Sequence, residues 1–203
     1  MLFRSPSTRL TWAANGTTSG GDGTWSTSGT TWSGAYGPEV WNPPARAIFT
    51  GTTFPTSTVT VAAGGVSVGD GMSFVTNGYT IGGAQITLAG TTASTNNVYV
   101  ESGVSATVNS AIAAASGLSK SGAGTLVMGG TISGGSVFVN NGTLQLASTG
   151  GIQPTAGAGV SVLASGTFDV TALSGGYVLP AGTGLAGAGN VLGNVTVAST
   201  SVV

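Results

Sequence analysis

The chain has no cysteine and no histidine, and charged residues of either sign are scarce. Four Lys+Arg and five Asp+Glu among 203 residues give a formal net charge of −1. The lack of cysteine excludes disulfides and thiolate metal sites. The shortage of Lys and Arg argues against partners that need a basic surface, namely nucleic acids and anionic membranes. Low charge with 40% hydrophobic residues also excludes the usual disordered class, which pairs low hydrophobicity with high net charge.

Long apolar runs are also missing. No window of about 18 apolar residues occurs, so we expect no transmembrane helix and no membrane insertion of this segment. The polar N-terminus lacks the apolar core of a signal peptide, which we interpret as a missing natural N-terminus rather than as a cytosolic location. The first five residues, Met1–Ser5, also match what the end of a sequencing adapter would encode, and we interpret them as an assembly artefact.

Glycine, in contrast, is abundant, with 37 residues, and it separates short runs from about residue 48 onward. In these runs Val, Ile, Thr, Tyr and Phe recur at alternate positions, the pattern of half-buried strands. Only Asn109–Ala115 has a helix-like composition, so crossover helices and a βαβ sheet are excluded. The predicted strands are Thr58–Val61, Val66–Val68, Met72–Val75, Tyr79–Ile81, Gln85–Leu88, Asn97–Val100, Ala106–Val108, Thr125–Met128, Ser136–Val139, Thr143–Leu146, Val160–Leu163, Thr167–Val170, Tyr177–Leu179 and Asn194–Val197.

Two all-β architectures fit such strands, a Greek-key sandwich and a β-solenoid with coils of ~20–30 residues. Internal similarity favours the solenoid. The segments Val98–Val108, Val137–Leu146 and Val160–Val170 each read V-x-V, a polar corner with Gly, and a second alternating strand. The pairs Asn77-Gly78 and Asn141-Gly142 are interpreted as solenoid corners, with hairpin turns as the alternative.

The first 46 residues differ from the rest because they hold all four tryptophans. A solenoid needs an atypical terminal unit over the open end of its core. We therefore predict a Trp-rich cap over residues 1–46 and β-helix coils over 47–203. As an alternative, the aromatic rings could form a platform on which sugar rings stack; the buried cap is favoured because exposed tryptophan clusters are uncommon. The residues concerned are Trp12, Trp25, Trp32 and Trp41.

Leu118–Met128 followed by Gly134–Leu146 resembles the autotransporter-associated β-strand repeat, also called the passenger-associated transport repeat. That pattern reads roughly L-x-K-x-G-x-G-T-L-x-L, a short loop, then G-G-T-x-V-x-x-G-T-L-x-L. The departures are Met128 for a Leu, Ser136 for a Thr, and a shorter loop. The best-formed repeat covers residues 117–146, and residues 25–81 and 185–197 resemble the segments that flank such repeats.

The resemblance implies a right-handed, single-stranded parallel β-helix in a bacterial passenger region. It also implies export across the outer membrane to the cell surface by a C-terminal β-barrel translocator, which would be a partner of this chain. Because the sequence stops at Val203 in mid-pattern, we interpret it as a fragment truncated at both ends. Host or matrix glycans and proteins are further expected partners.

Reactive side chains are too sparse to predict a catalytic residue, a cofactor or a metal site. A dyad of Lys120 with Ser119 or Ser121 is conceivable, but we expect Lys120 to lie at a solvated corner. The predicted function is a non-enzymatic, surface-exposed stalk or scaffold. The alternatives are an adhesin or glycan-binding module using the N-terminal aromatics, and a fragment of a β-helical polysaccharide-degrading enzyme. The enzyme requires at least three of five residues to share one groove, namely Asp70, Glu101, Asp169, Arg46 and Lys120.

Overall fold

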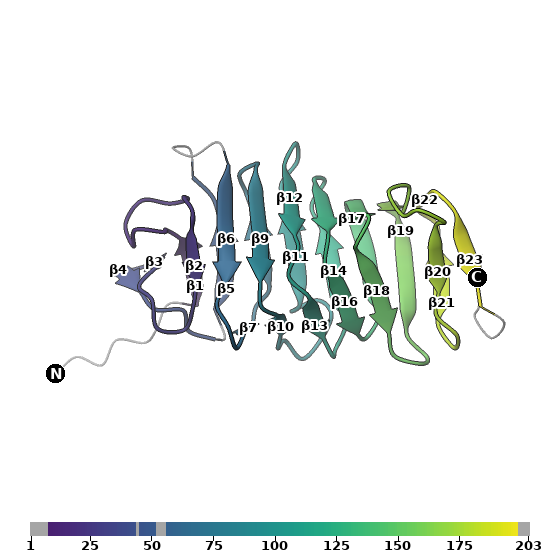
Figure 1. The fold of residues 1–203 in the computed structure, drawn as a ribbon, viewed down its shortest axis with the longest axis horizontal. Coiled ribbons are helices and arrows are strands. Elements are labelled where there is room, and N and C mark those ends of the chain that lie inside the picture. Colours follow the sequence, from purple (N-terminus) through teal and green to yellow (C-terminus); the bar gives the residue numbers. More distant parts are fainter. Residues whose placement is uncertain (1–7, 44, 52–55, 199–203) are drawn as a thin grey trace.

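The computed structural model describes residues 8–43, 45–51 and 56–198, and these residues form strands and no helix (Figure 1). The strands stack side by side along one long axis, and nearly all neighbouring pairs are parallel. Parallel partners in successive coils lie 18 to 37 residues apart, for example Leu126 beside Leu144 and Arg9 beside Arg46. The chain is a parallel β-solenoid of about seven turns. The solenoid prediction is therefore confirmed, and the sandwich is not formed.

Each complete coil contributes one strand to each of three faces. The first face holds β1 (Arg9–Trp12), β5 (Arg46–Phe49), β8 (Met72–Phe74), β11 (Asn97–Val100), β14 (Leu118–Ser121), the starts of β17 (Val137–Leu146) and β19 (Gly159–Asp169), and β21 (Gly184–Gly187). The second face holds β2 (Gly23–Trp25), β6 (Ser57–Val61), β9 (Tyr79–Gly83), β12 (Ser105–Val108), β15 (Thr125–Met128), the ends of β17 and β19, and β22 (Asn190–Leu192).

The third face is shorter and is divided in two. Its main sheet holds β7 (Val66–Val68), β10 (Ile86–Leu88), β13 (Ile112–Ala114), β16 (Thr131–Gly134) and β18 (Gly151–Pro154). Farther along, β20 (Tyr177–Leu179) pairs only with β23 (Val195–Val197). The two sheets are joined by a hydrogen bond of 2.9 Å from the Tyr177 hydroxyl to the Ile152 carbonyl oxygen.

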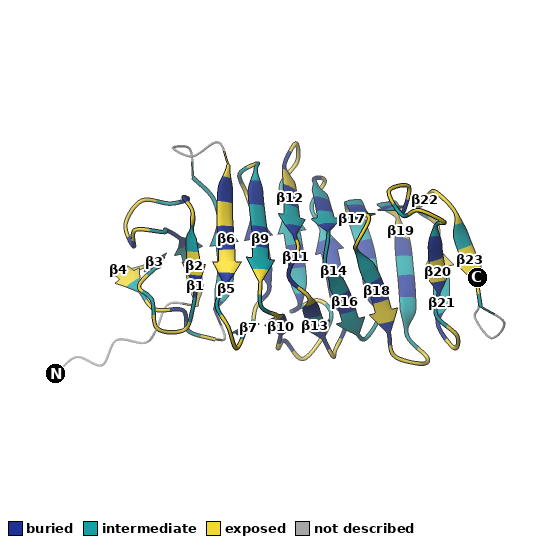
Figure 2. Cartoon of the chain, viewed as in Figure 1, coloured by how far each residue is buried: buried dark blue, intermediate teal, exposed yellow. Residues whose placement is uncertain are grey.

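Alternation along most strands places every second side chain in the core. In β6 the residues are buried and exposed by turns, and in β15 Leu126 and Met128 are buried while their neighbours are half-buried. Because the coils are in register, inward positions form columns along the axis, such as Leu126, Leu144 and Phe168. The apolar faces that one coil cannot bury alone are thus buried by the next coil. Figure 2 shows the resulting bands of buried residues on the strands of the middle coils.

Several predictions about single elements were wrong. The helix-like run Asn109–Ala115 contains strand β13, whose alanines fit the closely packed third face. The strands β14, β16, β18, β21 and β22 were not predicted. The two Asn-Gly pairs, in contrast, are corners rather than hairpins, as predicted: Asn141 and Gly142 lie beside Ser165 and Gly166 of the next coil in a parallel ladder. The Asn77 side-chain oxygen accepts a hydrogen bond from the Ser105 N–H of the next coil, at 2.8 Å.

The corner glycine at Gly122 meets two separate demands. Its φ of 75° lies in the left-handed region, which residues with a Cβ adopt at a cost. A Cβ at this position would also collide with the Val100 carbonyl oxygen of the preceding coil. Gly103 has the same φ of 75°, but a Cβ there would meet nothing within 4 Å. A comparison of Gly122 with Gly103 therefore separates the cost of backbone strain from the cost of the close approach between stacked coils.

We expect Gly103→Ala to lower the free energy of unfolding by about 1–2 kcal/mol, the cost of a left-handed alanine. Gly122→Ala should add a further ~1–3 kcal/mol, because the coils must move apart to admit the methyl group. Urea unfolding of both variants measures the difference. Equal destabilisation would show that coil contact does not constrain this corner.

Candidate functional site

The four tryptophans form one buried cluster at the N-terminal end. Each side chain is 0–2% exposed. The Trp32 ring is central, with ring centroids 5.2 Å from Trp12, 5.0 Å from Trp25 and 4.7 Å from Trp41. The edge-to-face contacts continue inward to Phe49, 5.7 Å from Trp25 and from Trp32. Such aromatic pairs add to the free energy gained from area burial, so the cluster closes the end of the core.

The backbone around the cluster also covers the first edge of the solenoid. Strand β3 (Trp32–Gly34) pairs antiparallel with β1 and then, through a hairpin, with β4 (Gly37–Glu39). The Trp41 Nε1–H donates to the carbonyl oxygen of Ser67 in edge strand β7, at 2.7 Å, and the Trp12 Nε1–H donates to Gly21 at 2.8 Å. The described part of the predicted cap is thus a lid on the core. Residues 1–7 and 44 lie outside the described residues.

Sugar stacking requires an accessible ring face, and none of these four rings offers one. The Nε1 atoms of Trp25 and Trp32 are buried without a hydrogen-bond partner. Unsatisfied buried donors carry a desolvation cost, which the packing of the rings must offset.

We expect Trp32→Ala to lower the free energy of unfolding by about 3–5 kcal/mol, since it removes the centre of the cluster and leaves a cavity. Val40→Ala, at a nearby side chain that is 43% exposed, should stay within about 0.5 kcal/mol of the parent. Denaturant unfolding followed by tryptophan fluorescence measures both. A Trp32→Ala variant with parent stability would contradict the lid interpretation.

The charged residues named for an enzyme occupy different places. Arg46 and Asp70 form an ion pair of 3.4 Å on the surface at the start of the first face. Glu101 directly follows strand β11 and accepts a hydrogen bond of 2.9 Å from the Tyr99 hydroxyl. Asp169 is the last residue of strand β19, three coils farther along the axis than Glu101. Among the described residues, therefore, these carboxylates do not share one groove.

The Asp169 carboxylate is held by its neighbours. It accepts hydrogen bonds from the side chain of Gln145 at 2.9 Å, and from the backbone and hydroxyl of Thr171 at 2.9 and 2.6 Å. Burial raises the pKa of Asp169, but these hydrogen bonds outweigh burial and leave the pKa below its usual value. The Asp169 carboxylate is therefore ionised at neutral pH, where it accepts these hydrogen bonds and is not a proton donor.

Lys120 does not lie at a solvated corner, and that prediction was wrong. Its side chain is fully buried and occupies an inward column between Val98 and Val139. The Nζ donates to three backbone carbonyls, those of Ser121 at 3.1 Å, Gly122 at 2.8 Å and Asn141 at 2.9 Å. The hydrocarbon stem therefore packs as an apolar residue would, and the ammonium group joins the corners of two successive coils.

Burial lowers the pKa of Lys120 from 10.5 to about 8. The three carbonyl oxygens act in the opposite direction, because they accept from the ammonium group and favour the charged form. At pH 7 the side chain is thus mostly a cation held by dipoles, with no carboxylate within ion-pairing distance among the described residues. Its donors are already used by the backbone, so it is poorly placed to act as a base with Ser119 or Ser121.

The lowered pKa predicts a pH-dependent stability. Between pH 8 and 10 the unfolded chain keeps the Lys120 proton that the folded chain releases, so the free energy of unfolding should rise with pH. Above pH 10 it should fall, because burial raises the pKa of Tyr79 and of Tyr177 to about 12. Urea unfolding at intervals from pH 7 to 10 measures the slope.

The matched variant is Lys120→Met, which keeps most of the side-chain volume and removes the titrating group. We expect the rise between pH 8 and 10 to disappear, and stability at pH 7 to fall by about 1–3 kcal/mol because the corner carbonyls lose a donor. A rise that persists in the variant would assign it to another group.

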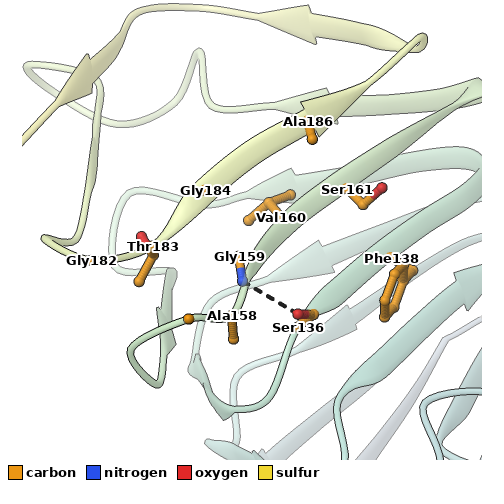
Figure 3. A pocket seen from close by; sticks show the side chains of 11 residues that line it. Ser136, Phe138, Ala158, Gly159, Val160, Ser161, Gly182, Thr183, Gly184 and Ala186 are labelled. Atoms are coloured by element: carbon orange, nitrogen blue, oxygen red, sulfur yellow. Dashed lines mark hydrogen bonds between the residues drawn. The ribbon is translucent and has the colours of Figure 1, made fainter. Parts of the chain in front are cut away.

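A groove of about 370 Å³ lies near the C-terminal end of the first face (Figure 3). Its floor is made by the outward residues of three successive coils, Phe138, Ser161 and Ala186. Two glycine-containing corners, 157–159 and 182–184, form one side. No sequence motif pointed to this groove; the signal that the sequence offered was an aromatic residue at the outward position of the V-F-V strand.

The groove has no group suited to catalysis. The Ser136 hydroxyl accepts from the Gly159 N–H at 3.3 Å, and the Thr183 hydroxyl donates to the Pro180 carbonyl at 2.6 Å. No charged side chain lines this groove, nor the depressions beside Pro43, Leu173 and Leu185. Its chemistry suits weak contact with an uncharged, partly apolar surface.

The described residues hold neither a cluster of metal ligands nor a membrane-spanning helix. Within residues 8–43, 45–51 and 56–198, no three His, Cys, Asp or Glu side chains gather as a metal site would need. No helix in these ranges has the length and apolarity to cross a bilayer.

A scan of family models and searches of curated proteins and of solved structures returned no match to the chain. The fold defines the class, a parallel β-solenoid.

Proposed function

We propose that the chain is a non-enzymatic structural segment of a bacterial autotransporter passenger, a β-helical stalk or scaffold exposed at the cell surface. The observation that carries the proposal is the uninterrupted stack of coils. Two parallel ladders run from the N-terminal lid to the last coil, and the core beneath them is continuous from Leu10 to Leu179.

Such a stack suits a load-bearing element. The backbone hydrogen bonds between coils lie along the long axis, so extension of the rod must break many of them together. The inward columns exclude water. The chain also has few charged side chains whose protonation could change with pH. The resemblance of residues 117–146 to the passenger-associated repeat supplies the cellular setting of this proposal.

The two alternatives receive less support. An adhesin that uses the N-terminal aromatics would need exposed rings, whereas the four tryptophans are buried. A polysaccharide-degrading site would need acids and bases in one groove. Asp70, Glu101 and Asp169 lie instead on different coils, and Lys120 is enclosed by backbone carbonyls.

The experiment is surface display. The chain is placed between a secretion signal and an outer-membrane translocator in a bacterium, and intact cells are treated with a protease. We expect the chain to reach the surface and to resist digestion, because its backbone is paired within the stack. The Gly122→Ala variant, with loosened coils, should be cleaved faster than Gly103→Ala. Retention inside the cell, or digestion of the parent as fast as an unfolded control, would refute the scaffold proposal.

A further inference from the structure

The outer surface of the second face carries two rows of hydroxyl-bearing side chains. Successive coils are in register there, so outward positions that lie two residues apart on each strand form lines along the axis. Figure 1 shows three of these strands, β6, β9 and β12, side by side. The residues of the two rows, called the threonine array below, are Ser105, Thr125, Thr143 and Thr167 in the first row and Thr58, Thr80, Thr107 and Val127 in the second.

The hydroxyls of the threonine array are unused within the protein. All the array side chains are exposed or half-buried, and none of their hydroxyls has a hydrogen-bond partner among the described residues. Several hydroxyls elsewhere are bonded internally. The Ser121 hydroxyl donates to the Asn97 side chain at 2.7 Å, and the Thr149 hydroxyl donates to the Gly129 carbonyl oxygen at 2.9 Å. The hydrogen-bonding capacity of the array is therefore directed outside the protein.

The threonine array is also rigid and uncharged. Thr and Val are β-branched, which leaves each side chain few rotamers, and the parallel ladder fixes the backbone beneath them. From β6 to β17 the strands of the second face hold no Asp, Glu, Lys or Arg. Asp169, which lies beside Gln145, is the first charge along the second row. Each threonine of the array thus presents one methyl and one hydroxyl group from a fixed position.

The spacing of the array points to a crystalline ligand. Neighbouring coils lie ~4.8 Å apart and alternate residues of one strand lie ~6.6 Å apart, so the hydroxyls form a nearly rectangular lattice. These two distances are close to the repeats of water oxygens on the prism faces of hexagonal ice. Strand propensity favours threonine at outward positions, but it does not by itself explain two unbroken rows of unused hydroxyls. A rigid array makes many weak contacts at once with little ordering cost.

We propose that the threonine array is an ice-binding surface. The methyl groups hold neighbouring water in cages and the hydroxyls bond that water, so that the ordered layer joins the lattice of a growing crystal. The absence of charge matters because ions keep a hydration shell that does not match ice. Adsorbed chains would then oppose growth of the crystal between them. This inference concerns a lateral face of the middle coils and does not depend on the proposed function.

The test measures thermal hysteresis and the fraction of the chain that enters slowly grown ice. We expect the parent to separate the freezing point from the melting point, by a gap that widens with concentration, and to be enriched in the ice. Thr125→Lys, at the centre of the array, should lose most of both effects because a solvated charge interrupts the lattice. The matched control is Thr87→Lys, at an exposed outward threonine of the third face, which should behave as the parent does. Circular dichroism checks that both variants are folded.

Three outcomes would overturn the ice-binding proposal. The first is a parent that shows no hysteresis and is excluded from ice as an ordinary solute is. The second is an equal loss in Thr87→Lys and Thr125→Lys, which would place the effect outside the array. The third is binding of the parent to microcrystalline cellulose or chitin without hysteresis, which would assign the array to a crystalline polysaccharide. If Thr125→Lys fails to fold, Thr143→Gln, which repeats the side chain of Gln145, replaces it and should also lose most of both effects; full retention by that folded variant would overturn the proposal.

Discussion

Parallel hydrogen bonding between successive coils is the constraint on which the other features depend. Among the strands from β5 to β23, parallel partners lie 18 to 27 residues apart, and the register repeats from coil to coil. A side chain therefore has its closest neighbours in the coils on either side rather than in the adjacent sequence. At the corners the same spacing brings one backbone against the next, which is why Gly122 must be glycine for reasons of space as well as of φ. Loops can vary in length because only the strands are held in register.

Lys120 shows how a polar residue can enter such a core. An apolar residue would suffice for the column between Val98 and Val139, but the corner backbone presents carbonyl oxygens that require donors. The ammonium group supplies three hydrogen bonds across two coils. Desolvation of the charge is the cost, and the lowered pKa reflects that cost. The lysine therefore links two successive coils through hydrogen bonds rather than serving as a reactive group.

The two ends of the rod face the same physical problem differently. A solenoid has an exposed core and unpaired strand edges wherever stacking stops. At the N-terminal end, a tryptophan cluster fills the core and a hairpin covers the first strand. At the C-terminal end, the last valines of the inward columns remain partly exposed. Between the two ends, the first face carries a shallow, uncharged groove beside Phe138.

The sequence by itself determined the fold class, because alternation with period two and glycine-rich corners are local properties. It also located most strands of the first two faces. It did not locate β13 and β16, since Ile112–Ala114 and Thr131–Gly134 are short and rich in small residues, and only stacking against the neighbouring coils makes them strands. Tertiary structure alone decided that Lys120 points inward, whereas the burial of the four tryptophans agrees with the cap that the sequence favoured. The physical reason is that the coil spacing, not the local sequence, sets which side of a corner a side chain occupies.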